Sequence, residues 1–500
     1  MASSEASRQW TLEPETEYRF ELDPDASLAI KLVHGNAEVF GAELAANRPY
    51  LFGQECKAAI YTWQGCTIEM SCRRAQRFRS AYRRPNVTGH PSTEYVSEET
   101  PMASYANVHN ALEKMRVRAL RHLRGSPVPP SERVESTEPP RVLVVGPENS
   151  GKTTLCKILT NYVVRTGQGW SPLLVNLDPS EGGWAAPGAI GVTPVHTPLP
   201  TSTPASPLGT AATSAPTALS SNALLPLAYW YGHAETRRNP LLIERIIRNL
   251  GENVKDKYQA HPEAQVAGFI VDTPSSFAVG NNEDRQRLLK ATIDAFKINV
   301  ILVVGHEKLN VELQRAYGSS ISVVKVPKSG GVVELDHLYR ERIHKFQLHT
   351  YFYGQVIQPP PGITSASLGS ETLSSIVLAP SSTILNFGDL SIYRIGAETM
   401  APSSALPIGA ARAVSETQAV AIDPAQPGSG LLNAVLAILA PPANGDDAER
   451  YDEEILDLPI SGFVVVTKLD IPHRKMTILA PNQGSIVGRT AVIGSYEWQE

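Results

Sequence analysis

A short apolar strand runs directly into a glycine-rich turn, and no other segment of the chain restricts the fold as strongly. The strand is Val142–Val145, and the turn after it has the spacing Gly146-x4-Gly151-Lys152-Thr153, which is that of a phosphate-binding loop. The glycines let the backbone amides point inward around a phosphate, and the helix that follows adds its positive end. We therefore expect a nucleoside triphosphate site at this turn.

The chemistry of such a site needs a cation for the phosphates and oxygen ligands for a metal ion. Lys152 is placed to reach the β and γ phosphates, and the Thr153 hydroxyl is placed to ligate Mg²⁺. Asp178 and Asp272 each end a predicted strand, and the ligand crevice of a parallel sheet lies at the carboxyl ends of its strands. Both carboxylates are therefore candidates to face the nucleotide. A helix-capping role is the alternative for each.

Composition excludes several other classes of protein. The chain has 500 residues, of which 42% are hydrophobic and 19% charged, so two to four soluble globular domains are expected. No apolar run reaches the length of a membrane span, and the first residues lack the apolar core of a secretory signal. The 4 cysteines have no zinc spacing and indicate a reducing compartment. A net charge of −5 argues against coating nucleic acid by bulk charge but not against a local basic groove.

The pattern along the chain predicts a multi-domain α/β protein. Alternating apolar residues in 1–125 predict a β-rich N-terminal domain that ends in a connecting helix, and the Pro-rich segment 126–140 reads as a linker. Strands and helices alternate through 141–354, which predicts a central phosphate-loop domain with a parallel sheet covered by helices on both faces. Strand patterns return in 355–500, for which we expect a small mixed α+β domain.

One stretch of the central domain does not fit the alternation. Thr, Pro, Ser and Ala dominate 193–226, and no charged residue occurs between Glu181 and Glu235. A segment of this composition has too little to bury, so we expect 193–226 to be a disordered insertion.

Three further patterns are open to two interpretations. The arginines of 73–84 either contact phosphate or form a solvated loop. Lys328–Glu334, with Arg340 and Arg342 beyond it, is either a mobile segment that brings a cation over the phosphates or a plain turn before a helix. Thr467–Asp470 superficially resembles a guanine-reading signature, but its position far beyond the phosphate loop favours a strand end and a turn.

Several specific strings point to one family. They are Gly35–Leu44, Thr100–Met102 with Tyr105, His109, Leu112 and Glu113, the phosphate loop, Lys328–Glu334, Tyr351–Gly354 and Gly462–Thr467. Together they resemble the polynucleotide 5′-hydroxyl-kinase-related subunit of the pre-mRNA cleavage and polyadenylation machinery. The resemblance spans nearly the whole chain.

This resemblance implies that ATP is clamped between the N-terminal and central domains. Glu17 and Lys57 match the positions that meet the adenine end, and Thr153 and Asp178 would hold Mg²⁺. The phosphate contacts fall on Asn149, Ser150, Gly151, Lys152, Thr153 and Thr154. The family further implies a nuclear location and, as in the fungal cleavage factor IA, docking on a scaffold subunit, with RNA touched directly or through that partner.

Active members of this group transfer the ATP γ-phosphoryl to an RNA 5′-hydroxyl, and the chain departs from their pattern in three places. Asn176 replaces the first acid of Asp-x-Asp-x-Gly-Gln, and Leu335 stands where a lid arginine is expected, which leaves Arg340 as the second lid position. Thr273–Phe277 replaces the Thr-x-Gly-Trp segment that helps hold the RNA end. Losing a cation that neutralises the transition state costs about 10³ or more in rate. We therefore expect an ATP-binding structural subunit with weak or no kinase activity.

The alternative is an active RNA 5′-hydroxyl kinase whose motifs have drifted. In that case Lys152, Asp178 and Arg340 are the candidate catalytic residues. Slow ATP hydrolysis that acts as a timer is a third hypothesis.

Overall fold

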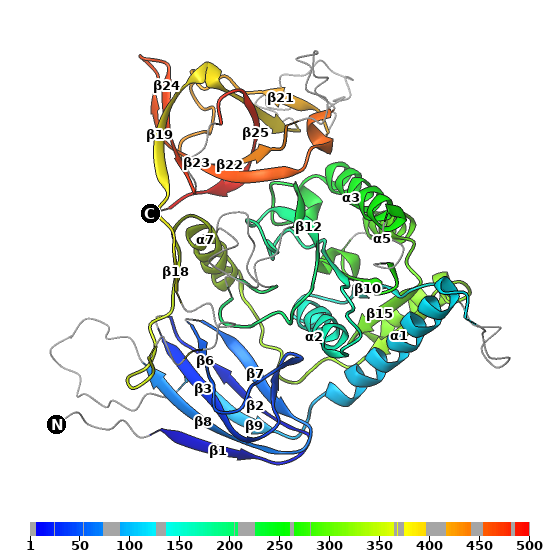
Figure 1. Ribbon diagram of the computed structural model, residues 1–500. Helices are drawn as coiled ribbons and strands as arrows, with labels where there is room; N and C mark the ends of the chain where they lie inside the picture. The colour runs from blue at the N-terminus through cyan, green and yellow to red at the C-terminus, as the bar shows by residue number, and fades with distance from the viewer. Residues whose placement is uncertain are drawn as a thin grey trace, which may run out of the picture.

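The computed structural model places three bodies in a row, with the central body between the N-terminal and the C-terminal body (Figure 1). It describes residues 7–499 except for positions 25, 54, 74–90, 127–136, 205, 209–225, 261–264, 281, 365–367, 369–374, 397–416, 442–453 and 482–485. Most of the arginine segment 73–84 and most of the predicted linker 126–140 lie outside the described residues.

The N-terminal body consists of two sheets that enclose one apolar core. One sheet has the strand order β1-β8-β3-β6 and the other has the order β5-β4-β7-β2-β9. Along β8 buried and less buried residues alternate, as expected for a strand with one face on a core. The elements are β1 (Arg8–Leu12), β2 (Thr16–Glu21), β3 (Ser27–Gly35), β4 (Glu38–Val39), β5 (Ala42–Glu43), β6 (Pro49–Phe52), β7 (Lys57–Thr62), β8 (Cys66–Arg73), β9 (Thr93–Ser97) and then the connecting helix α1 (Met102–Leu123).

The central body is a seven-stranded sheet in the order β13-β12-β11-β14-β10-β15-β16, and the five strands from β11 to β16 run parallel. One face packs on a core that includes residues of α3, α5 and α6, and the other packs on residues of α1 and α2. The predicted parallel sheet with helices on both faces is thus confirmed. Its elements are β10 (Arg141–Val145), α2 (Lys152–Arg165), β11 (Leu173–Asn176), β12 (Ala189–Pro194), β13 (Leu227–Trp230), η3 (Thr236–Arg238), α3 (Pro240–Ala260), β14 (Phe269–Asp272), η4 (Ser275–Phe277), α5 (Asn282–Phe296), β15 (Val300–Val304), α6 (Glu307–Tyr317), β16 (Ser322–Val326) and α7 (His337–Tyr353).

The C-terminal body is a second seven-stranded sheet, in the order β19-β24-β23-β22-β25-β20-β21, in which only β20 and β25 pair in parallel. This confirms a small mixed domain. Among its described residues we find strands and 3-10 turns but no α-helix, so the helical part of the α+β prediction for 355–500 is not seen there. The elements are β19 (Ser381–Asn386), η6 (Phe387–Asp389), β20 (Leu390–Ile395), β21 (Ala419–Ala421), β22 (Ala434–Leu439), η8 (Glu454–Asp457), β23 (Ile460–Asp470), β24 (Lys475–Ala480) and β25 (Arg489–Glu497). Before them, β17 (Gly354–Val356) and β18 (Ser375–Val377) pair with each other in a separate two-stranded sheet.

The predicted disordered insertion over 193–226 is wrong for its first part. Val195, Leu199 and Leu208 are buried against the core beneath α1 and α2. The polar backbone of this segment is satisfied by two side chains of α2. Asn161 exchanges hydrogen bonds with the backbone of Leu199, and the Lys157 ammonium donates to Pro200 O, Thr201 Oγ1 and Pro207 O at 2.8, 2.6 and 3.0 Å. A segment without charges can therefore be buried here because α2 supplies its polar partners.

Replacing Lys157 with Met should release this segment. Three partly buried acceptors would lose their donor, which costs about 1–3 kcal/mol of the free energy of unfolding. Chemical denaturation and limited proteolysis between residues 195 and 208 would measure the effect. The matched control is Lys290→Met on α5, where the lysine is exposed and no change is expected. Equal stability of the two variants would contradict this role of Lys157.

Candidate nucleotide site

The phosphate loop folds as its glycines predict. The loop leaves β10 and enters α2 at Gly151, and Asn149 and Gly151 both adopt left-handed backbone conformations, with φ of 51° and 85°. A Cβ at Gly146 would lie 2.8 Å from the Ser150 hydroxyl, so the loop closes tightly on itself. No side chain caps the first turn of α2. Its backbone N–H groups are therefore free to bind an anion.

Polar atoms inside the loop fit a phosphate ligand. The Lys152 ammonium donates to Pro147 O at 3.0 Å, so the lysine lies folded over the loop. The hydroxyl of Ser150 is buried and has no hydrogen-bond partner. A tight loop with inward amides, a lysine and an unpaired hydroxyl matches the donor set that a triphosphate requires.

Thr153 meets Asp272 rather than Asp178. The Thr153 hydroxyl donates to Asp272 Oδ2 at 2.6 Å, and Asp272 Oδ1 is buried without a partner. Burial raises the pKa of Asp272 to about 6, against the hydrogen bond from Thr153 and the charge of Lys152. The carboxylate of Asp178 accepts from the backbone and hydroxyl of Ser180 at 3.0 and 2.6 Å. Both aspartates are therefore placed at the loop, but Asp272 is the direct partner of the predicted metal ligand.

Sequence reasoning missed a third acid at this edge of the sheet. Glu181 lines the same cavity as Asp178 and the loop. Burial, followed by the charges of Asp178 and Asp272, raises the pKa of Glu181, whereas Arg340 and Lys152 oppose that shift. Within the part of the chain that the structure describes, no three His, Cys, Asp or Glu side chains form a metal cage.

Arg340 reaches the phosphate loop from α7. Its Nη2 donates to Asn149 Oδ1 at 2.8 Å and lies 3.0 Å from Glu148 Oε1. The segment Lys328–Glu334, called the lid segment below, also contacts the phosphate loop, since a Cβ at Gly151 would lie 3.0 Å from Val332 Cγ2. Leu335, where a lid arginine was expected, also lines the cavity. The cation that contacts the phosphate loop here is therefore Arg340 of α7.

Helix α7 is fixed to the loop that carries the acids. His344 Nε2 lies 2.7 Å from Ser180 O, and Gln347 Nε2 donates to Glu181 O at 2.9 Å. Tyr339, near the start of the helix, donates to Glu55 O of the N-terminal body at 3.3 Å. The helix that carries Arg340 is consequently attached to two bodies at once.

One cavity of about 1550 Å³ joins the phosphate loop to the N-terminal body. It is lined by all the residues predicted to contact the nucleotide, namely Glu17, Lys57, Asn149, Ser150, Gly151, Lys152, Thr153 and Thr154. Glu17 is buried, and Lys57 pairs with Glu21 and lies over the Tyr339 ring. The volume exceeds the usual 300–1,000 Å³ of a small-molecule site, because the cavity continues past Arg237 toward Tyr496 of the C-terminal body.

The residues of the other motifs singled out in the sequence make hydrogen bonds within the fold. Asn176 holds the loop after β11, since its Oδ1 accepts from Asp178 N at 3.0 Å and its Nδ2 donates to Asp178 O at 3.3 Å. Thr273 is buried and donates to Val144 O. Asp470, the acid of the guanine-like string, accepts from His473 in the turn between β23 and β24. A turn is therefore the better explanation of that string.

Fold and site together define a three-domain phosphate-loop protein, and comparison with known proteins narrows the class. Residues 146–354 match the family profile described as mRNA cleavage and polyadenylation factor CLP1 P-loop. Residues 11–119 match the N-terminal beta-sandwich domain of polyadenylation factor, and residues 378–500 match Pre-mRNA cleavage complex II protein Clp1.

Relatives cover the whole chain. An mRNA cleavage and polyadenylation factor CLP1 from Laccaria bicolor is 69% identical over 99% of this chain and 98% of its own length. A CLP1 homolog from Arabidopsis thaliana is 33% identical over 99% and 94%. The solved structure of a wild-type Clp1p–Pcf11p complex covers 100% of both chains with a TM-score of 0.75 at 23% identity. The chain belongs to the Clp1 family of mRNA cleavage and polyadenylation factors, which confirms the resemblance drawn from its motifs.

The role of Asn176 can be tested directly. Asn176→Asp removes the donor to Asp178 O and places a carboxylate beside that carbonyl at a residue that is 1% exposed. We expect a loss of about 1–3 kcal/mol in the free energy of unfolding. Chemical denaturation would measure it, with Asn36→Asp as the control because Asn36 is exposed. An Asn176→Asp variant as stable as the control would contradict a loop-holding role.

Proposed function

We propose that this chain is the nucleotide-binding structural subunit of a nuclear pre-mRNA 3′-end cleavage and polyadenylation complex. The observation that carries the proposal is one continuous cavity to which both bodies contribute, with Glu17 and Lys57 of the N-terminal body on one side and the phosphate loop on the other. A ligand that binds only this arrangement stabilises it by mass action, by about 4 kcal/mol at a thousand times its dissociation constant. Bound ATP would thus hold the N-terminal domain (1–125) against the central domain (141–354).

In this proposal each wall of the cavity has its own task. Glu17 and Lys57 meet the base, whereas the loop amides, Lys152 and Arg340 meet the phosphates. Thr153 and Asp178 hold Mg²⁺, and the hydrogen bond from Thr153 to Asp272 adds Asp272 to this set. When bound, Mg²⁺ neutralises phosphate charge.

The partner in this proposal is another subunit of the cleavage factor. Two solved neighbours support it, both described as Clp1p with Pcf11p, and one of them is reported with the loss of ATP in a point mutant. Those are properties of the neighbours, and we extend them to this chain because its family is the same. Among the described residues, we find no helix that combines the length and the apolar composition of a membrane span.

Weak or absent phosphoryl transfer follows from two positions at which this chain differs from the pattern of active kinases. Leu335 supplies no cation at the position of the expected lid arginine, and the side chain of Asn176 is engaged with the backbone of Asp178. Binding relies on the loop, Lys152 and Thr153, all of which are retained. We therefore expect nucleotide binding to be kept and transfer to be lost.

An assay for bound nucleotide and for transfer tests this proposal. The purified chain should contain ATP and should not label a 5′-hydroxyl oligoribonucleotide with γ-labelled ATP. Lys152→Ala should lower ATP affinity by about 10–100-fold, because a charged hydrogen-bond donor to the phosphates is lost. Lys255→Ala, on the exposed side of α3, is the control. Labelled RNA that disappears in Lys152→Ala would instead identify a working kinase.

The metal assignment has a separate test. In Asp272→Asn, ATP affinity measured with Mg²⁺ should fall about tenfold, because a ligand or positioning group for the metal is lost. The same measurement with EDTA should give equal affinities for variant and wild type. Asp256→Asn, at an exposed site on α3, serves as the control. A loss of equal size with and without Mg²⁺ would contradict the assignment.

A further inference from the structure

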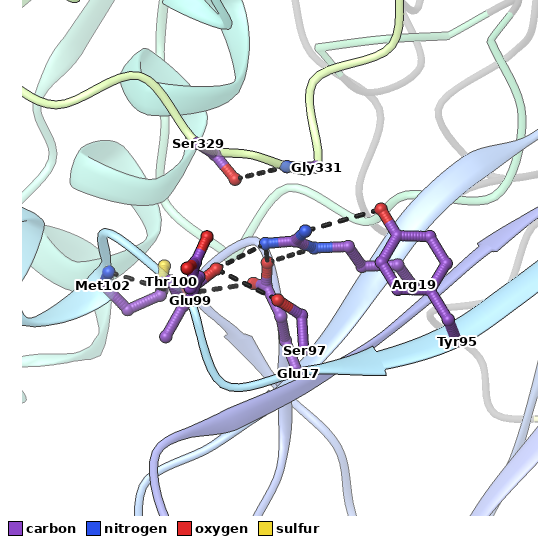
Figure 2. Close-up of polar contacts among 9 residues, drawn as sticks. All are labelled: Glu17, Arg19, Tyr95, Ser97, Glu99, Thr100, Met102, Ser329 and Gly331. Atoms are coloured by element: carbon purple, nitrogen blue, oxygen red, sulfur yellow. Dashed lines mark hydrogen bonds and ion pairs between the residues drawn. The ribbon is translucent and has the colours of Figure 1, made fainter.

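Arg19 lies at the wall that the N-terminal body contributes to the cavity, and its guanidinium has a partner on each nitrogen. Nε donates to Glu17 Oε1 at 2.5 Å, Nη1 donates to the Tyr95 hydroxyl at 3.4 Å, and Nη2 donates to Glu99 O at 2.7 Å. Nη2 also forms an ion pair with Glu17. Figure 2 shows the guanidinium between Glu17 and Tyr95. Arg19 is only 7% exposed, so the surrounding residues restrict the position of its guanidinium.

The partner that matters here is Glu17, a carboxylate which is itself buried. Its second oxygen accepts from the Thr100 hydroxyl at 3.3 Å. Burial raises the pKa of Glu17, and the charge and hydrogen bond of Arg19 oppose that shift. A buried carboxylate without a cationic partner is costly. Arg19 therefore both favours the ionised form of Glu17 and fixes its direction.

The lid segment closes on the same guanidinium. A Cβ at Gly331 would lie 2.6 Å from Arg19 Nε and 3.0 Å from Arg19 Cδ. The backbone of Gly331 is not left-handed, so its conformation does not require glycine. Glycine is needed there because a side chain would collide with Arg19. The next residue, Val332, covers Gly151 of the phosphate loop. One short segment thus contacts the phosphate end of the cavity and, through Arg19, the end formed by the N-terminal body.

We propose that Arg19 is a positioning residue of the nucleotide site: its guanidinium holds the Glu17 carboxylate at the cavity wall and forms the surface on which Gly331 closes. This inference rests on the proposed function, because it takes Glu17 to meet the base. Its consequence is that the lid and the base end are coupled through one side chain. A change at Gly331 that displaces the guanidinium should also disturb Glu17, and a change at Arg19 should also disturb the contact with Gly331.

A matched pair of glycine variants tests the contact with the lid. Gly331→Ala should push the guanidinium off Glu17 and lower ATP affinity by about tenfold. Gly330→Ala is the control, because Gly330 does not line the cavity and its added Cβ would stand 3.6 Å from Arg19 Nη1, at ordinary contact distance. Its ATP affinity should stay within about twofold of wild type. Equal affinities of the two variants would overturn the inference.

A second experiment separates positioning from a structural role. Arg19→Lys keeps a charge but loses the fork that grips Glu17 and Glu99. It should lower ATP affinity about tenfold while leaving affinity for Mg²⁺ tripolyphosphate, which has no base, within about twofold. In the Arg19→Lys background, Gly331→Ala should cost little more, since the pair acts as a unit. Equal loss for both ligands, or fully additive losses, would overturn the proposal.

The proposed function and this inference fail in different ways. Wild-type protein that binds no ATP by calorimetry would contradict the proposed function itself. If the wild-type protein binds ATP but the Gly331→Ala and Gly330→Ala variants bind it equally well, the proposed function stands and the positioning role of Arg19 is contradicted.

Discussion

Helix α2 is buried around most of its circumference, polar side chains included, and the docking of the N-terminal body depends on how those polar groups are satisfied. Burying an amide, a hydroxyl or an ammonium without a partner costs several kcal/mol. Tyr162 and Arg165 meet Glu38 of the N-terminal body at 2.5 and 2.6 Å, and Asn161 donates to Phe40 O. The helix that begins at the phosphate loop is thus also the one that anchors the N-terminal sheets.

This anchoring gives the nucleotide site its particular shape. Because Glu38, Phe40 and Gly41 are fixed on α2, strand β7 and its neighbour β2 are carried to the mouth of the loop. Lys57 begins β7 and Glu17 lies in β2. The site is therefore built by docking two folded bodies and not by one of them alone, which explains why its lining residues come from distant parts of the chain.

The sequence predicted what depends on local pattern and failed where the outcome depends on distant contacts. The glycine-rich loop and the parallel sheet could be predicted from spacing and periodicity. Which aspartate meets Thr153 could not, because it depends on strand order: β14, which ends in Asp272, lies next to β10, whereas β11 is one strand further. The segment around Leu199 lacked charges and read as disordered, but its partners Lys157 and Asn161 lie on α2. The contact of Arg19 with Gly331 joins opposite parts of the sequence and leaves no local signal.

Helix α7 touches all three bodies within its 17 residues. Tyr339 contacts the N-terminal body, Arg340 the phosphate loop, and the Tyr351 hydroxyl accepts from the backbone N–H of Phe463 in the C-terminal sheet at 3.0 Å. A rigid rod attached at three points cannot move at one end alone. Linkage then imposes a symmetry: if a protein docked on the C-terminal sheet shifts this rod, it changes nucleotide affinity by the same factor by which the nucleotide changes the affinity of that protein.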